Sequence, residues 1–278
     1  MRNRGVRKVL LLVAGAVFLF SAGMVSKHNA EMRIGAAQAE TVVQEVVTVV
    51  DVAEPAKPPA PQPTGQTAEA VPPSAPDAAA AVEVVKTAPI QVDFDALCGK
   101  YPDVAAWLYC PDSPINYPVV QSEDNAYYLH RLLDGRKNSA GTLFMDYRNS
   151  PDLSDWNCII YGHNMTNDSM FGTLTDYKSQ AYFEAHPEMY LLTPERSFAI
   201  TLMAGFTAAA NDELYSAFSP DESERERLVN DWLAASDFYA GITPDEGDRL
   251  ITLSTCSYEY DNARYVLVGI LQELRTAD

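Results

Sequence analysis

Cysteine is scarce in this chain, and its few cysteines lack the spacing of a metal or redox site. The 278 residues include 4 Cys, and no two of them form a C-x-x-C pair, which argues against a zinc ribbon and a thioredoxin-like motif. Four Cys are also too few to hold together a disulfide-rich scaffold. The chain is 47% hydrophobic, which is enough to bury a real core, so it is not disordered as a whole.

Positive charge is also in short supply. The chain has 20 Lys and Arg against 38 Asp and Glu, a formal net charge of -18. All of the excess lies in residues 90–278, which carry 12 basic and 30 acidic groups. Phosphate would repel such a chain, which argues against non-specific nucleic-acid binding. Because the acidic groups are scattered, we interpret them as favouring solubility; attraction of a cationic partner is the alternative.

The chain has one long uncharged apolar run, at residues 9–25, and four basic residues precede it within the first eight positions. Its 17 residues reach the lower end of what spans a bilayer and exceed a typical cleavable signal. We therefore expect a single-pass membrane anchor, with residues 1–8 in the cytoplasm and the remainder outside the cell. The alternative is a secretory signal cleaved after Ala39, which also exports the chain.

Residues 26–89 are expected to form an extracellular spacer rich in Pro, Ala and Val. Eight prolines lie between positions 55 and 76, a density that prevents helices and sheets and favours extended chain. Residues 41–50 are compatible with a short helix or strand, but nothing near them in the sequence offers a partner. Order is expected to resume at Ile90 and to continue to residue 278.

The ordered part begins with helical spacing and then becomes strand-like. Apolar residues recur three or four positions apart between 94 and 108, which predicts one or two short amphipathic helices. A helix is also predicted to begin near Ser219, with Ser219 as N-cap, Pro220 at its first position and Glu222 in a capping box. Seven short apolar or alternating runs predict strands of a barrel or sandwich. They are residues 117–120, 142–146, 158–161, 189–192, 198–206, 250–255 and 265–271.

Cys256 is the candidate nucleophile among the four cysteines. It follows a strand-like run that ends in hydroxyl residues and precedes a polar stretch, so it is placed where a neighbouring His or cation can activate a thiol. Cys158 lies inside an apolar run and is predicted to be a core thiol. Cys98 and Cys110 are predicted to be structural, and a disulfide between them is left open.

His163 and Arg264 are the candidate partners of that thiol. His163 follows the apolar run 159–161, and Gly162 lets the chain turn immediately before it. Arg264 opens the last predicted strand, eight residues after Cys256. A tight hairpin would return its guanidinium to the thiol, where it would stabilise an oxyanion. A structural histidine and a surface arginine are the alternatives when each residue is considered alone.

Three segments together resemble the signature motifs of sortases, the membrane-anchored cysteine transpeptidases of Gram-positive bacteria. They are Tyr161-Gly162-His163-Asn164, Thr252-Leu253-Ser254-Thr255-Cys256 and Asn262-Ala263-Arg264-Tyr265-Val266. The resemblance covers roughly residues 94–274 and is greatest to class B. Segments 107–109, 116–121, 124–129 and 141–149 and the helix after Ser219 carry the likeness to that class.

The resemblance implies a mainly β fold, an eight-stranded sortase-type barrel with N-terminal helices and a long helix between strands 6 and 7. It therefore requires one strand more than the pattern separates, and we expect the eighth between residues 101 and 113. It also implies that Cys256 attacks the Thr carbonyl of a C-terminal sorting motif, that Arg264 steadies the oxyanion, and that His163 protonates the leaving amine.

By the same resemblance, the partners are surface proteins that bear a sorting motif and an amine of peptidoglycan or of its lipid-linked precursor. Cofactors and metals are expected to be absent. The groove for the sorting motif is expected to involve Asn125, Leu129, Leu214, Tyr215, Ser254 and Thr255. Two alternatives stay open: a pilin-polymerising sortase with a Lys acceptor, and a surface-displayed binding module without chemistry.

Overall fold

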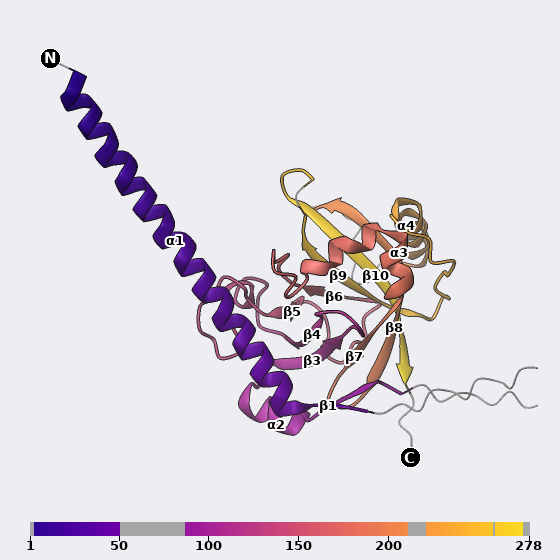
Figure 1. The fold of residues 1–278 in the computed structure, drawn as a ribbon. Coiled ribbons are helices and arrows are strands. Elements are labelled where there is room, and N and C mark those ends of the chain that lie inside the picture. The colour runs from indigo at the N-terminus through magenta and orange to yellow at the C-terminus, as the bar shows by residue number, and fades with distance from the viewer. Residues whose placement is uncertain (1–2, 51–86, 211–220, 258, 275–278) are drawn as a thin grey trace, which may run out of the picture.

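The computed structural model describes residues 3–50, 87–210, 221–257 and 259–274 (Figure 1). Its helices are α1 (Asn3–Val46), α2 (Phe94–Lys100), η1 (Tyr128–His130), η2 (Gly172–Lys178), α3 (Gln180–Ala185) and α4 (Glu222–Ala235). Its strands are β1 (Val47–Val49), β2 (Ile90–Val92), β3 (Val104–Tyr109), β4 (Asn116–Val120), β5 (Leu143–Met145), β6 (Asn157–Tyr161), β7 (Glu188–Leu192), β8 (Ser197–Ala209), β9 (Arg249–Cys256) and β10 (Ala263–Leu274).

Eight of these strands close into a barrel in the order β10-β8-β7-β3-β4-β5-β6-β9, so the predicted eight-stranded barrel is confirmed. The strand missing from the sequence pattern is β3, which lies within the interval expected for it. The helices predicted from the spacing between residues 94 and 108 are therefore correct for the first part of this range only. It predicts α2 correctly, but residues 104–109 form a strand because β4 and β7 flank and pair with them, and tertiary pairing overrides local periodicity.

Strands β9 and β10 are buried on both faces, so their positions, and the end at which Cys256 and Arg264 lie, are fixed by packing. Leu253 and Leu267 face the interior of the barrel, whereas Val266 and Val268 pack on the outside beneath α4. On that outer side Trp232 of α4 stacks on Trp156, with ring centroids 5.7 Å apart. Because side chains alternate along a strand, residues 252, 254 and 256 of β9 also point to this outer face.

Helix α4 connects β8 and β9, which are the sixth and seventh strands of the barrel. Its predicted start was wrong: the helix begins at Glu222, and its N-cap is Asp221, whose carboxylate accepts a hydrogen bond from the Glu224 backbone N–H at 2.9 Å. An Asp caps a helix as well as a Ser does, and two such signals in succession cannot be ranked by sequence alone. Ser219 lies outside the described residues.

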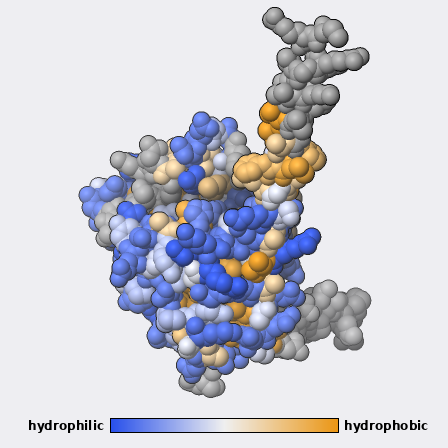
Figure 2. Space-filling model, turned by 90° about the vertical axis from the view of Figure 1, so that its left-hand side faces the viewer, coloured by the Kyte–Doolittle hydropathy of each residue, from blue (hydrophilic) through white to orange (hydrophobic). Residues whose placement is uncertain are grey.

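Helix α1 is a single 44-residue helix that projects from the barrel at its N-terminal end (Figure 1). Its C-terminal part packs on the domain through Gly35, Val42 and Val46, which are buried at helical spacing. Residues 9–25 lie within its projecting part, and the portion of it that is coloured by hydropathy is largely apolar where the helix leaves the barrel (Figure 2). Within the described part of the chain, no helix meets the length and hydropathy that a membrane span requires.

The chain segment after α1 pairs with the segment that opens the ordered domain. Strands β1 and β2 form a two-stranded antiparallel sheet, with Val47 opposite Val92 and Val49 opposite Ile90. The partner that the sequence pattern did not supply is therefore β2. The expected spacer 26–89 divides accordingly: residues 31–49 belong to elements packed on the domain, whereas residues 51–86 lie outside the described residues.

Candidate active site

Cys256 and Arg264 lie directly opposite each other on neighbouring strands. Cys256 is the last residue of β9, Arg264 is the second of β10, and the register of the antiparallel pair matches one with the other. Residues opposite each other in such a pair have Cβ atoms about 5 Å apart on the same face. Both side chains are half-buried. The hairpin therefore returns Arg264 to the position opposite Cys256.

Strand β6 brings His163 to the same end of the barrel. It runs parallel to β9, with Tyr161 opposite Ser254. Beyond that pair the Gly162 backbone N–H donates to the Ser254 carbonyl at 3.1 Å, and the Thr255 hydroxyl donates to the Gly162 carbonyl at 2.8 Å. These bonds extend the parallel register two residues past the end of β6, so that His163 comes level with Cys256.

Gly162 is required here for space rather than for a turn. A Cβ built on it would lie 2.4 Å from Leu143 Cδ2 and 2.6 Å from Phe171 Cδ2, distances that side-chain atoms do not tolerate. The residue before the histidine must therefore lack a side chain so that the chain can pass between Leu143 and Phe171.

The imidazole of His163 is held by the segment around η1. Its Nε2 lies 2.6 Å from the Leu129 carbonyl oxygen, so this nitrogen carries a proton that it donates. The His130 ring stacks on it with centroids 5.5 Å apart. Burial lowers the pKa of His163, the Leu129 carbonyl opposes this, and positive charge on His130 lowers the pKa further. The Nδ1 atom is consequently left as the basic nitrogen of a ring that is neutral at neutral pH.

Asn164 forms a second link between the histidine segment and the nucleophile, which the sequence reasoning missed. Its side-chain amide donates to the Cys256 carbonyl at 2.9 Å. It thereby fixes the backbone of the residue that carries the thiol. The stacking of His130 on His163 was missed as well. No sequence signal marks either contact, because the paired residues are 92 and 33 positions apart in the chain.

The residues predicted to contact the sorting motif fall into three groups. The Ser254 hydroxyl is buried with no hydrogen-bond partner among the described atoms, and it shares the outer face with Cys256. Thr255 and Leu129 already bond to the segment of His163, through a hydroxyl and a carbonyl respectively. Leu214 and Tyr215 lie outside the described residues.

Asn125 has both ends of its amide engaged within the protein. Its nitrogen donates to Asp146 Oδ2 at 2.8 Å, and its oxygen accepts from the Tyr147 backbone N–H at 3.0 Å. Asp146 is fully buried. Burial acts to raise the pKa of Asp146, but hydrogen bonds from Arg148, Asn125 and Tyr161 outweigh it and hold that pKa below its usual range. Asn125 therefore ties its loop to an ionised carboxylate.

The other three cysteines are free thiols placed where thiolate formation is unfavourable. Cys158 is fully buried, as predicted, and burial raises its pKa to about 12. Burial also raises the pKa of Cys110 and of Cys98. Since both are free, the disulfide left open between Cys98 and Cys110 is not formed. Among the described residues, no group of three or more His, Cys, Asp or Glu is arranged to hold a metal ion.

The strand register thus places Cys256, His163 and Arg264 at one end of β6, β9 and β10, with a half-buried thiol and an imidazole whose Nδ1 is its basic nitrogen. Part of the guanidinium is held in place, because Arg264 Nη1 donates to the Ala263 carbonyl at 2.9 Å. An arginine has five N–H donors, so others remain for a ligand. This set of groups suits attack on a carbonyl with stabilisation of the resulting oxyanion.

Comparison with known proteins supports the same chemistry. Residues 108–272 match the family model of the sortase domain. Sortase B of Listeria monocytogenes is 34% identical over 171 residues, which cover 61% of this chain and 70% of that protein.

Solved structures of sortase B share the fold. Clostridium perfringens sortase B superposes with a TM-score of 0.61 at 29% identity and covers 64% of this chain and 99% of its own. Bacillus anthracis sortase B, solved in complex with AAEK1, has a TM-score of 0.59 at 32% identity and covers 64% of this chain and 83% of its own.

Proposed function

This chain belongs to the sortase family and to its class B, and it is therefore a cysteine transpeptidase; we propose that Cys256 is its nucleophile, His163 its acid and base, and Arg264 its oxyanion-stabilising group. The observation that carries this assignment is the direct pairing of Cys256 with Arg264, at the level that His163 reaches from β6. We propose the Ser254 hydroxyl, which is buried beside this pair without a hydrogen-bond partner among the described atoms, as a further contact of the bound peptide.

In the first half of the reaction, the sulfur of Cys256 attacks the carbonyl carbon of the Thr in a sorting motif. The thiol proton moves to His163, and the new C–S bond places negative charge on the carbonyl oxygen. The Arg264 guanidinium donates to that oxygen, as donors fixed in advance do in acyl transfer. The C–N bond then breaks, and His163 returns its proton to the leaving amine.

In the second half, an acceptor amine attacks the thioester carbon. His163 takes the proton of the attacking nitrogen, the C–S bond breaks and the thiol of Cys256 is restored. The acceptor we propose is an amine of cell-wall peptidoglycan or of its lipid-linked precursor, and the donors are surface proteins with a C-terminal sorting motif. A pilin Lys acceptor would leave the chemistry at Cys256 unchanged.

We place this reaction at the outer face of the cell membrane, with residues 9–25 as the anchor and residues 1–8 inside. In support, the large apolar side chains of this run are exposed on α1: Val13, Val17, Phe18, Leu19, Phe20, Met24 and Val25 are 55–72% exposed, which is costly for so many apolar groups in water. Holding enzyme and substrates at one surface raises their effective concentration.

The assignment is tested with the full chain in detergent micelles. The full chain is used because the C-terminal part of α1 packs on the barrel. A panel of fluorogenic sorting-motif peptides is assayed with and without an amine acceptor. The test variant is Cys256→Ala. The matched control is Cys98→Ala, because Cys98 is also a half-buried free thiol. We expect turnover to be lost only in Cys256→Ala. A chain that cleaves no peptide and whose Cys256 resists alkylation would be a binding module instead.

A further inference from the structure

The connection between the apolar run of α1 and the barrel is short and helical. His28 Nδ1 lies 3.4 Å from the Ser139 hydroxyl, and Asn138 Nδ2 donates to the Glu31 carbonyl at 2.8 Å. Glu31 is six residues beyond Val25, which corresponds to about 9 Å along a helix. The loop that contains Asn138 is therefore held within roughly one headgroup layer of the end of the apolar run.

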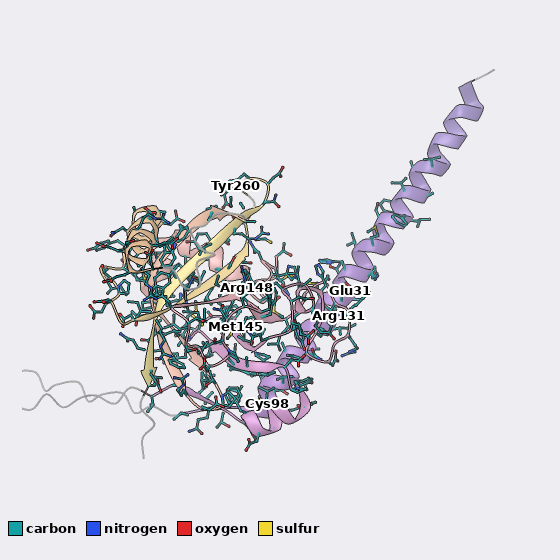
Figure 3. The ribbon with its side chains drawn as sticks, turned by 180° about the vertical axis from the view of Figure 1, so that it is seen from behind. Glu31, Cys98, Arg131, Met145, Arg148 and Tyr260 are labelled. Atoms are coloured by element: carbon teal, nitrogen blue, oxygen red, sulfur yellow. The ribbon has the colours of Figure 1, made fainter. Side chains whose placement is uncertain are left out.

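The segments that meet at this junction carry positive charge, in contrast to the rest of the domain. Residues 27–33 and 131–137 contain five basic residues against two acidic ones, whereas residues 90–278 as a whole carry 12 against 30. We call the five basic residues the basic collar. They are Lys27 and Arg33 on α1 and Arg131, Arg136 and Lys137 on the barrel. Figure 3 labels Arg131 beside Glu31 at this junction.

Four of the five collar residues are exposed, whereas Arg131 is half-buried, and both acidic residues of these segments are paired. The side chains of Lys27 and Arg136 are 80% and 63% exposed, and Arg33 and Lys137 are exposed without an acidic partner among the described residues. Glu31 pairs with Lys27 at 3.7 Å and Asp134 with Arg136 at 2.6 Å. These two pairs occupy two of the collar cations, so the segments keep a net excess of three positive charges (5 − 2) at headgroup level. Such an excess attracts an anionic lipid surface.

The collar is also continuous with the segment that holds the catalytic histidine. Arg131 bridges to Lys137 and so closes a small loop, and it directly follows η1. In η1 the Leu129 carbonyl bonds His163, and His130 stacks on the same ring. A surface that binds the collar therefore lies next to the His163 side of the site.

We propose that the basic collar docks on anionic phospholipid headgroups around α1, so that the barrel is held against the membrane with its η1 side toward the lipid. The proposal rests on the proposed membrane location of α1. It assigns the collar a role distinct from the chemistry at Cys256. A soluble phosphate ester carries the same negative charge as a lipid headgroup. The test below distinguishes binding of such an ester from docking on lipid.

The test measures amide hydrogen exchange of the full chain in lipid nanodiscs. One set of discs contains phosphatidylcholine only. In the other set, about one lipid in three is the anionic phosphatidylglycerol. We expect residues 131–140 to exchange at least about five-fold more slowly in the anionic discs. This factor corresponds to the binding free energy of about 1 kcal/mol that one basic residue gains near an anionic surface. High salt should remove the difference.

The collar variant is Arg33→Gln with Arg136→Gln and Lys137→Gln. It leaves Arg131 in place, because the Arg131 guanidinium donates to the Gly135 carbonyl and lies over the Tyr127 ring and so supports the loop. In this variant we expect the same exchange in both kinds of disc.

The matched control removes the same charge elsewhere, with Lys100→Gln, Arg225→Gln and Arg227→Gln on α2 and α4. It should retain the lipid-dependent protection of the native chain. The proposal would be overturned if the native chain exchanged equally in both kinds of disc. It would also be overturned if the control variant lost lipid-dependent protection to the same extent as the collar variant. Protection in neutral discs on addition of glycerol 3-phosphate would assign the collar to a soluble anion and overturn it as well.

Peptide cleavage in detergent separates this proposal from the proposed function. A native chain that cleaves peptides but shows no lipid-dependent protection refutes the docking alone. A chain that fails to co-purify with either disc refutes both the anchor and the docking, while cleavage in detergent would still establish the chemistry at Cys256.

Discussion

Cys256 on β9 and Arg264 on β10 are cross-strand partners at the end of the antiparallel β9–β10 pair, with Thr255 opposite Tyr265 as the next pair. The backbone positions of the two residues relative to each other are thus set by the strand register and not by a loop. Directional donation by this guanidinium, as well as its charge, stabilises an oxyanion.

Replacing Arg264 with Lys keeps the charge but removes the planar set of donors. We expect kcat/KM for a cleaved sorting-motif peptide to fall by about 100- to 1,000-fold, the effect of removing an oxyanion donor, with an unchanged melting temperature. The control is Arg249→Lys, at the opposite end of β9, which should keep native kinetics. Native kinetics in Arg264→Lys would remove the guanidinium from the mechanism.

The stacking of His130 on His163 predicts a measurable pKa effect. A positive charge on His130 disfavours a second positive charge on His163 and lowers its pKa. We therefore expect His130→Gln to raise the pKa of His163, measured by NMR titration of the imidazole signals and assigned with His163→Gln. An unchanged or lowered pKa would contradict the contact seen between the rings.

Burial of His163 also predicts how stability depends on pH. Its folded pKa lies below its unfolded value of 6.5, so the unfolded chain binds more protons in the interval between the two. Stability is therefore lost as the pH falls from about 6.5 toward the folded pKa. Urea melts at pH 7.5 and pH 5.5 should show a larger loss for the native chain than for His163→Gln.

The steric role of Gly162 predicts that an added methyl group destabilises the fold at the site. Gly162→Ala would force its Cβ onto Leu143 and Phe171, and we expect a loss of about 1–3 kcal/mol in urea melts. Gly99→Ala is the control, because that helical glycine has nothing within 4 Å of an added Cβ. The control should be stabilised by about 0.5–1 kcal/mol. Equal stability of the two variants would refute the steric argument.

The two hydrogen bonds of Asn125 predict that it stabilises its loop whether or not it contacts substrate. Asn125→Ala leaves the buried Asp146 with one donor fewer, and we expect a loss of about 1–3 kcal/mol. Asn230→Ala, at an exposed position of α4, should be close to neutral. If Asn125→Ala kept native stability but lost turnover, the residue would act through the substrate alone.

The three residues that we propose for the chemistry could be identified from sequence because each lies at the end of an apolar strand. His163 and Cys256 follow runs that are buried in the barrel, and Arg264 opens the next one, so local pattern and family motif point to the same three positions. The contacts that orient them could not be predicted. Asn164 reaches Cys256, and Leu129 reaches His163, only after the barrel has closed.

The same distinction between local and long-range information explains the errors in the fold. The strand Val104–Tyr109 depends on neighbours that the local sequence does not contain. The start of α4 at Glu222 is a different case, because it depends on which of two successive capping residues the helix uses. The partner of β1 lies beyond the proline-rich segment, and even the nearest pair of this sheet, Val49 with Ile90, is 41 positions apart in the chain. Pairing across such a distance has no local signal.

The most direct test of the central claim is to trap the acyl intermediate. The full chain is mixed with a cleaved sorting-motif peptide, quenched in acid and analysed by intact mass and by peptide mapping. We predict an added mass equal to the N-terminal part of the peptide, located on the Cys256 peptide and released by hydroxylamine. An adduct on any other residue, or native cleavage by Cys256→Ala, would contradict the assignment of Cys256 as the nucleophile.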